Sequence, residues 1–189
     1  MLKTKNNTKK QKKKERISCF DFLVLERENN QGIAIKDMWK YDFETMNNKH
    51  GYIQWLFPTD ELSSRNPKAP TISEDFYKCL QFDPEYKITL RSNIMQSFVN
   101  FLSFLGLEHK GMAIIKGPMY IERSQDWLKP NNHNFLRISR ILQCLILMDL
   151  KPQAELFYKS LKNIYEESAE NQSIISDSFD YWSNIVFEN

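Results

Sequence analysis

The chain has 189 residues, 41% of them hydrophobic and 13% aromatic, with a formal net charge of +2. This composition is typical of one soluble globular domain, and it excludes collagen-like chains and small scaffolds that need disulfides to hold a core. No apolar run approaches the ~18 residues of a membrane span, and the charged amino terminus is not followed by the apolar h-region of a signal peptide. We therefore expect neither a span nor a secretory signal, and a cytoplasmic location, or a nuclear or perinuclear one in a eukaryote.

The charge is divided unevenly along the chain. Residues 1–16 contain eight basic side chains and one acidic side chain, so that the remaining residues hold 18 of the 26 basic groups and 23 of the 24 acidic groups. We expect 1–16 to be a disordered basic tail and 17–189 to be the folded domain. The tail is either a localisation signal or an anchor for nucleic acid or an acidic surface, or it only adds solubility. The acidic domain itself is a poor surface for nucleic acid.

The first predicted elements are short. Residues 19–26 alternate loosely and are rich in strand formers, which predicts a short strand or an extended arm. Apolar residues spaced by three and four over 43–57 predict a helix that Asp42 caps and Pro58 ends. The second half of this helix, in the stretch HGYIQWLFP, is apolar on nearly all sides, so we expect it to lie in the core.

A loop over 58–71 and three longer helical patterns follow. Ser73 is suited to cap a short helix with Phe76 and Leu80 inward. The stretch 86–105 has a broad apolar stripe, and Gly106 fits a left-handed cap at its end. Residues 108–130 are mixed, with an apolar run between glycines and then one or two helical turns.

The carboxy-terminal part also shows helical spacing. The predicted helices cover 134–149, a stretch that starts around Pro152, and 172–187. The inner face of the last helix consists of Ile175, Phe179, Trp182 and Val186. The expected fold is therefore all-α, a compact single domain of about six helices with an irregular, partly extended amino-terminal arm.

Signatures of known chemistry are missing from the sequence. It has no glycine-rich phosphate loop, no GxSxG, no HExxH and no paired-cysteine zinc spacing. Three isolated histidines (His50, His109 and His133) are better explained as caps or packing residues than as metal ligands. Three distant cysteines (Cys19, Cys79 and Cys144) are expected to be thiols in a reducing compartment, and the last two lie on apolar helix faces. We expect no cofactor and no metal.

The polar side of the predicted 134–149 helix is the best candidate site. Arg137 and Arg140 are three residues apart and follow the run Asn131–Asn134 at the helix start. Arginine forks together with helix N–H groups would suit a phosphate or a carboxylate. The alternative is internal pairing of both arginines with acids such as Asp60, Glu61 or Asp126.

Three blocks of this sequence together resemble the amino-terminal domain of the opioid growth factor receptor family. They are DFETMNNKHGYIQWLFP, then NPKAP, and then WLKPNNHNFLRISRIL with LKPQAELFYKSL behind it. The resemblance covers roughly residues 20–165, and Ser139 stands where the family pattern has threonine. It implies an opioid growth factor receptor-like binding domain, with an opioid pentapeptide, met-enkephalin, as the ligand of vertebrate members. It supplies no catalytic residues.

The leading hypothesis is a non-enzymatic module that binds a peptide or protein ligand. Its predicted binding residues are Asn132, His133, Asn134, Arg137, Arg140, His50 and Gln54. One alternative is an enzyme with a pocket around His50, His133 and the two arginines. Another is association with nucleic acid through the basic tail.

Overall fold

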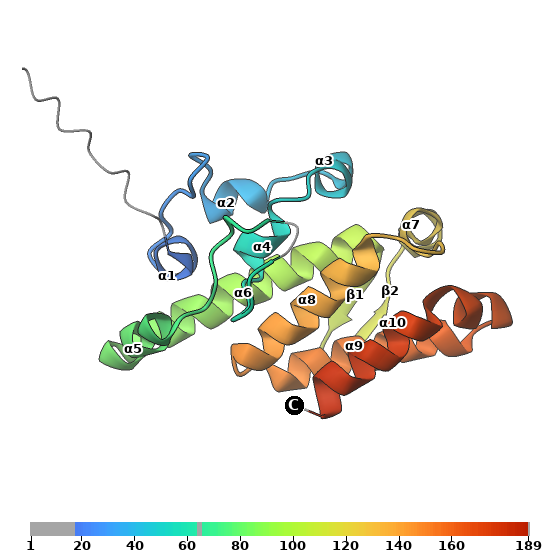
Figure 1. The fold of residues 1–189 in the computed structure, drawn as a ribbon. Coiled ribbons are helices and arrows are strands. Elements are labelled where there is room, and N and C mark those ends of the chain that lie inside the picture. The colour runs from blue at the N-terminus through green and yellow to red at the C-terminus, as the bar shows by residue number, and fades with distance from the viewer. Residues whose placement is uncertain (1–17, 64–65, 189) are drawn as a thin grey trace, which may run out of the picture.

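The computed structural model describes residues 18–63 and 66–188, and the basic tail 1–16 lies outside them. The described residues form ten helices and one two-stranded hairpin (Figure 1). In chain order these are α1 Cys19–Leu23, α2 Ile35–Met38, α3 Phe43–Asn48, α4 Ile53–Leu56, α5 Glu74–Phe82, α6 Pro84–Leu105, β1 Leu107–Lys110, β2 Ala113–Lys116, α7 Tyr120–Trp127, α8 Asn134–Leu147, α9 Lys151–Glu166 and α10 Ala169–Phe187. The fold is therefore mostly helical, as predicted, and six of its helices have eight or more residues.

The strand prediction for 19–26 is wrong, because α1 occupies the first part of this stretch. Ser18 and Asp21 form a capping box in which each side chain binds the backbone N–H of the other residue. This local signal overrides the strand preference of the aromatic and β-branched residues that follow. The chain after α1 is irregular up to α2, which agrees with the expected irregular arm.

The predicted helix over 43–57 is two short helices. Asp42 caps α3 as expected, with its side chain accepting from the N–H of Thr45 at 2.8 Å. The helix then stops at Asn48, and Lys49 is extended, because the sequence NNKHG contains poor helix formers. α4 resumes at Ile53 and ends before Pro58. The HGYIQWLFP stretch lies largely in the core, as predicted, but its first residues, His50 and Gly51, are exposed.

The helices α5 and α6 follow the predicted pattern. Ser73 accepts from the N–H of Phe76, and both inward residues of α5 are buried. α6 begins two residues before the predicted helix and ends at Gly106, whose φ of 79° confirms the left-handed cap. A Cβ at Gly106 would lie 2.6 Å from the Cα of Tyr120, so glycine is required there for close packing as well as for its conformation.

The mixed stretch after α6 contains an antiparallel hairpin, which the all-α prediction did not include. β1 pairs with β2 in the register Leu107 with Lys116, and Gly111 turns the chain with a φ of 56°. The apolar run GMAIIKGP is therefore strand and turn, while α7 confirms the helical turns predicted after it.

The last three helices pack against one another next to the hairpin (Figure 1). Ser168 caps α10, and Ile175, Trp182 and Val186 are buried as predicted. Phe179 is half-buried and stacks on tyrosines of α9. Buried side chains from every helix form a single apolar cluster that includes most of the HGYIQWLFP stretch. Among the helices of residues 18–63 and 66–188, none has the length and apolar character needed to cross a membrane.

Candidate functional site

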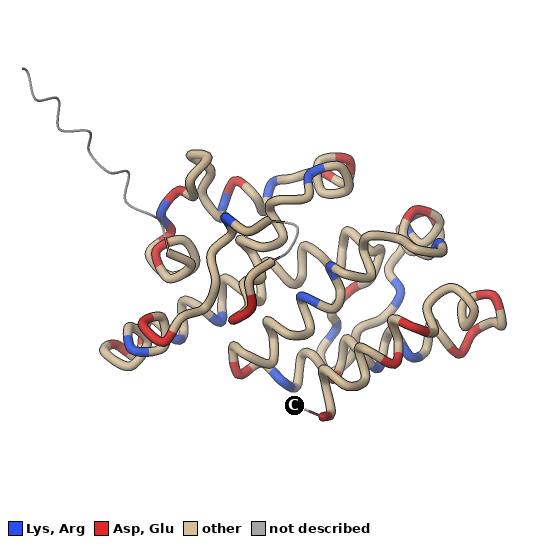
Figure 2. Tube along the Cα trace, in the orientation of Figure 1, with Lys and Arg blue, Asp and Glu red and all other residues tan. Residues whose placement is uncertain are grey.

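The two longest blocks of the family resemblance meet in the folded chain. The HGYIQWLFP stretch and the end of α3 lie against the first two turns of α8, and the contact is made by Arg137 and Arg140. These arginines are the charged residues of α8, which carries no acid along its length (Figure 2). We call this contact the α3–α8 junction.

Arg137 is 4% exposed and binds backbone carbonyls. Its Nη1 donates to the carbonyl of Met46 at 2.9 Å and its Nη2 to that of Lys49 at 2.8 Å, with a longer bond to Asn47 at 3.4 Å. These carbonyls belong to the carboxy-terminal end of α3, where a helix lacks internal donors and where a positive charge is favourable. Arg137 therefore caps α3 from a distant helix.

Asn134 and Tyr52 complete the surroundings of the Arg137 guanidinium. Asn134 is fully buried, and its Oδ1 accepts from Arg137 Nη1 at 2.9 Å. The Tyr52 ring lies 5.4 Å from the guanidinium carbon, and burial raises the pKa of the Tyr52 hydroxyl to about 12. Burial also lowers the pKa of Arg137 from its ordinary value, although an arginine stays charged at neutral pH.

Arg140 is half-buried and makes one bond of the same kind. Its Nε donates to the carbonyl of Phe57 at 2.7 Å, at the end of α4. Its Nη2 is shielded from solvent and has no hydrogen-bond partner among the described residues. The alternative, that both arginines pair with acids, is wrong, because neither makes an ion pair within 18–63 and 66–188, and each binds backbone carbonyls instead.

The two histidines of the predicted site also meet at this junction. The rings of His50 and His133 are edge to face with centroids 5.2 Å apart, and His50 Nδ1 lies 3.5 Å from Arg137 Nη2. His50 is exposed and His133 is half-buried. Burial and the nearby Arg137 charge lower the pKa of His133, so its neutral form is favoured.

The remaining predicted site residues bind the backbone. Asn132 donates from Nδ2 to the carbonyl of Asp126 at 2.9 Å and accepts from the N–H of Asn134 at 2.9 Å, which fixes the start of α8. Gln54 is buried, and the carbonyls of His50 and Gly51 lie 3.0 Å and 3.1 Å from its amide, which donates to both when its nitrogen is the atom turned toward them. The structure thus brings all seven predicted residues to one region, but most of their polar atoms are used inside the fold.

The same capping of short helices occurs on α6, which the sequence analysis did not identify. Asn93 Nδ2 donates to the carbonyl of Leu23 at the end of α1 at 2.7 Å, and Asn100 Nδ2 donates to the carbonyl of Trp39 at the end of α2 at 3.1 Å. Ser97 lies between them and accepts from the Trp39 indole at 2.8 Å. Polar residues spaced by four and three within an apolar helix were the available signal, since such a stripe needs buried partners.

The outer face of α8 remains available to a ligand. Leu136 is 61% exposed and lies one turn before Arg140. Gln143 continues this face and binds the hydroxyl of Tyr181 on α10 at 3.3 Å. An exposed apolar side chain and a half-buried cation are therefore neighbours on this face of α8.

Thiol and metal chemistry have little support here. Cys144 is fully buried and burial raises its pKa, while Cys19 is 1% exposed with its pKa raised to about 12. Both thiols therefore stay protonated and are poor nucleophiles. Within the described part of the chain, no group of three or more His, Cys, Asp or Glu side chains is placed to hold a metal ion.

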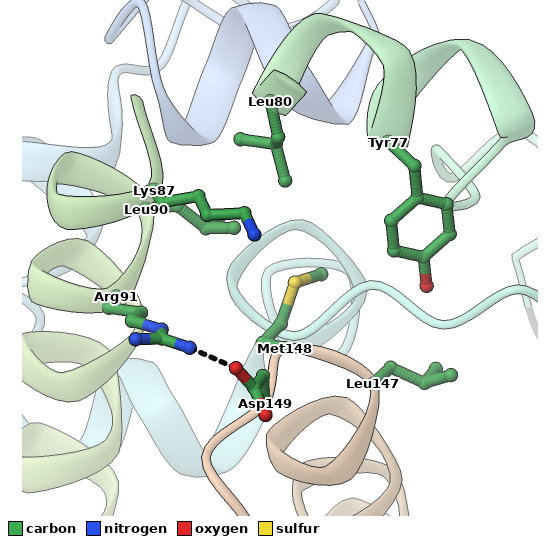
Figure 3. A pocket seen from close by; sticks show the side chains of 8 residues that line it. All are labelled: Tyr77, Leu80, Lys87, Leu90, Arg91, Leu147, Met148 and Asp149. Atoms are coloured by element: carbon green, nitrogen blue, oxygen red, sulfur yellow. Dashed lines mark hydrogen bonds and ion pairs between the residues drawn. The ribbon is translucent and has the colours of Figure 1, made fainter. Parts of the chain in front are cut away.

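Two hollows lie away from the junction. One has a volume of about 110 Å³ and lies between α5, α6 and the turn after α8, where eight residues line it (Figure 3). The other is an open depression along α9 that includes Tyr158, Lys162 and Phe187. Neither contains a residue of the predicted site.

The chain is similar to a known protein family and to several known proteins. Residues 12–189 match the family described as the opioid growth factor receptor conserved region. The opioid growth factor receptor-like protein 1 of Xenopus tropicalis is 30% identical over 152 residues, which cover 78% of this chain and 27% of that protein. Its counterpart in Mus musculus is 31% identical over 137 residues, covering 70% and 26%. The opioid growth factor receptor of Homo sapiens is 30% identical over 122 residues, covering 60% and 17%.

These relatives are much longer proteins, and this chain spans about a quarter or less of each. No solved structure matches the chain. The family match extends over almost the whole sequence, including both blocks that form the α3–α8 junction. The chain therefore belongs to the family defined by the conserved region of the opioid growth factor receptor.

Proposed function

We propose that this protein is a non-enzymatic module that binds a peptide or protein segment through a carboxylate of the ligand at Arg140. The observation that carries the proposal is the incomplete bonding of this arginine. Its Nε is bound to the carbonyl of Phe57, whereas its Nη2 has no partner among the described residues. An unpaired buried donor costs free energy, and because the Arg140 side chain as a whole is only half-buried, a ligand acceptor that reaches it is stabilised.

The surroundings of Arg140 support a carboxylate over a neutral acceptor. No acid lies on α8, and Arg137 is one turn away in the direction of the junction. The exposed Leu136 side chain offers an apolar contact next to the charge. A peptide carboxyl group preceded by an apolar side chain matches both features.

Binding agrees better with this geometry than catalysis does. The site has histidines and arginines, but Cys19 and Cys144 are buried thiols and Arg137 is occupied by backbone carbonyls. An enzyme would need a nucleophile or a general base next to a concave pocket. The hollow beside α5 and α6 and the depression along α9 are lined by other residues.

The names of the relatives suggest the first ligand to try. Several are called opioid growth factor receptor, and the family resemblance implies an opioid pentapeptide as the ligand of vertebrate members. Met-enkephalin ends in a methionine with a free carboxylate. It therefore has the apolar side chain and the anion that Leu136 and Arg140 would contact.

The test is calorimetric titration of the whole chain with met-enkephalin and with its carboxy-terminal amide. We expect the free acid to bind about tenfold or more tightly than the amide, because hydrogen bonds between charged groups contribute about 1.5–3 kcal/mol. Arg140→Gln should remove this difference. Lys162→Gln, which removes an exposed lysine on α9, should preserve it.

Two results would contradict the proposal. One is equal affinity for acid and amide in the wild type, which would show that no carboxylate is recognised. The other is an unchanged preference for the acid in Arg140→Gln, which would place the carboxylate elsewhere. If met-enkephalin does not bind at all, the same comparison is made with a peptide library of free and amidated carboxy termini, and a library without a carboxylate preference would overturn the proposal.

A further inference from the structure

The hollow between α5, α6 and the turn after α8 has the size and lining of a pocket for one side chain (Figure 3). Its volume of about 110 Å³ is small compared with the roughly 300–1,000 Å³ of pockets that hold whole small molecules. Its apolar floor is formed by Leu80, Leu90 and Met148, which are 6%, 3% and 4% exposed. These side chains are already part of the core, so the floor is preformed.

The rim of this pocket is positively charged. Lys87 and Arg91 lie one turn apart on α6, and Arg91 forms an ion pair with Asp149 across the opening (Figure 3). The Lys87 ammonium points over the apolar floor, and no carboxylate among the described residues lies within ion-pair distance of it. This local excess of positive charge stands out because the chain beyond residue 16 carries more acids than bases.

We propose that this pocket docks an acidic segment of another protein, which inserts one leucine-, methionine- or phenylalanine-sized side chain. A carboxylate next to the inserted side chain pairs with Lys87. A second carboxylate competes with Asp149 for Arg91. The pocket shares no residue with the Arg140 site, and its role does not depend on that site.

The charge pattern selects this partner over other classes. An uncharged apolar segment would cover Lys87 without pairing it, and desolvating an unpaired ammonium is costly. A nucleic acid could satisfy the two cations, but it offers no aliphatic side chain for the floor. The Arg91–Asp149 pair is exposed, with Asp149 85% accessible, so its opening costs little.

The test uses the whole chain with ¹³C-methyl-labelled methionine, because the Met148 side chain lines the pocket. The probe is the acetylated, amidated hexapeptide EELFEE, compared with QQLFQQ and EEAAEE. The Met148 signal is assigned with Met148→Leu, a substitution of similar volume. Met112 on the hairpin turn is 83% exposed and serves as the internal control signal.

We expect EELFEE to shift the Met148 signal in a saturable way and to leave the Met112 signal unmoved. QQLFQQ and EEAAEE should each bind about tenfold more weakly, since each lacks one of the two required features. Lys87→Gln should weaken EELFEE binding about threefold or more, because it removes the exposed charge without disturbing the core. Lys162→Gln should have no effect.

Each opposite outcome overturns the proposal. A Met148 signal that does not move at millimolar EELFEE shows that the pocket takes no such side chain. Equal binding of QQLFQQ shows that the rim does not select acids. Equal binding of EELFEE by wild type and Lys87→Gln shows that Lys87 is not part of the recognition.

Discussion

The amino-terminal part of the fold, from α1 to α4, and the α8–α10 layer are built in different ways. α8, α9 and α10 have 14, 16 and 19 residues, and each buries a continuous apolar stripe. α1 to α4 have 4 to 6 residues each. An isolated helix shorter than about 12–15 residues is marginal in water, so the short helices depend on the rest of the molecule.

This dependence has a repeated form. Each of the four short helices has a carbonyl at or next to its carboxy-terminal end that accepts a hydrogen bond from a side chain of α6 or α8. The donors are Asn93 for α1, Asn100 for α2, Arg137 for α3 and Arg140 for α4. The long helices hold the core together, and their polar residues set the positions of the short helices.

The largest effect on stability is expected from a core substitution in the α8–α10 layer. Phe157 on α9 is fully buried and packs edge to face against Phe98 of α6. Phe157→Ala should lower the free energy of unfolding by about 3–5 kcal/mol, because it leaves a large cavity in the core. Urea denaturation followed by circular dichroism measures this change. A loss below about 1 kcal/mol would contradict the central place of this residue in the core.

Arg137→Ala should lower the free energy of unfolding somewhat less than Phe157→Ala, and its effect should be concentrated in α3 and α4. The substitution removes the donor of the buried Met46 carbonyl and of the part-buried Lys49 carbonyl, which should cost about 2–4 kcal/mol. Hydrogen exchange should rise mainly in α3 and α4 while α9 stays protected. Lys162→Ala on the exposed side of α9 is the control. Equal loss of protection in all helices would contradict this prediction, because Arg137 would then stabilise the whole fold and not mainly α3 and α4.

Asn93→Ala tests the same principle at α1 with a neutral donor. The buried bond to the carbonyl of Leu23 is lost, and we expect a cost of about 1–3 kcal/mol. Asn100→Ala, whose bond to Trp39 is longer and only part-buried, should cost less. Denaturation midpoints of the two variants compare them directly. If Asn93→Ala costs no more than Gln96→Ala, a change at an exposed residue of α6, the capping of α1 does not contribute to stability.

The helices of the α8–α10 layer could be predicted from the sequence, while the bounds of the short helices α1 to α4 could not. Periodic apolar residues gave α8, α9 and α10 within a few residues, and Gly106 gave the end of α6. The break after Asn48 and the helix at Cys19 arise from local capping and from donors far along the chain, such as Arg137. A periodicity argument contains no information about such distant partners.

The candidate site also has features that the sequence predicted and features that depend on distant contacts. His50, His133 and the two arginines, which the sequence analysis grouped in one site, lie around the α3–α8 junction in the structure, and their role in ligand binding stays a prediction. The sequence did not show that Arg137 faces inward, since spacing by three places two arginines on adjacent rather than identical directions of a helix. Whether an arginine binds a ligand or a helix end depends on what packs against it, and this was visible only in the structure.

The smallest expected effect is a pH dependence of the α3–α8 junction. The pKa of His133 is lowered in the folded protein by burial, by Arg137 and by His50. The unfolded chain therefore takes up this proton first as the pH falls through about 6.5, and the free energy of unfolding decreases from there until the folded protein is protonated as well. Above that range, where both states are neutral, the residue adds no pH dependence.

Urea denaturation at pH 8 and pH 5.5 measures this effect in the wild type and in His133→Asn, since asparagine is a good residue at the start of a helix. The stability lost between the two pH values should be smaller in the variant. Hydrogen exchange should place the difference in α3 and at the start of α8, where the added positive charge would lie next to Arg137. An equal loss in both proteins would assign the acid sensitivity to other groups, and the junction would then be held by the arginine bonds independently of the histidine pair.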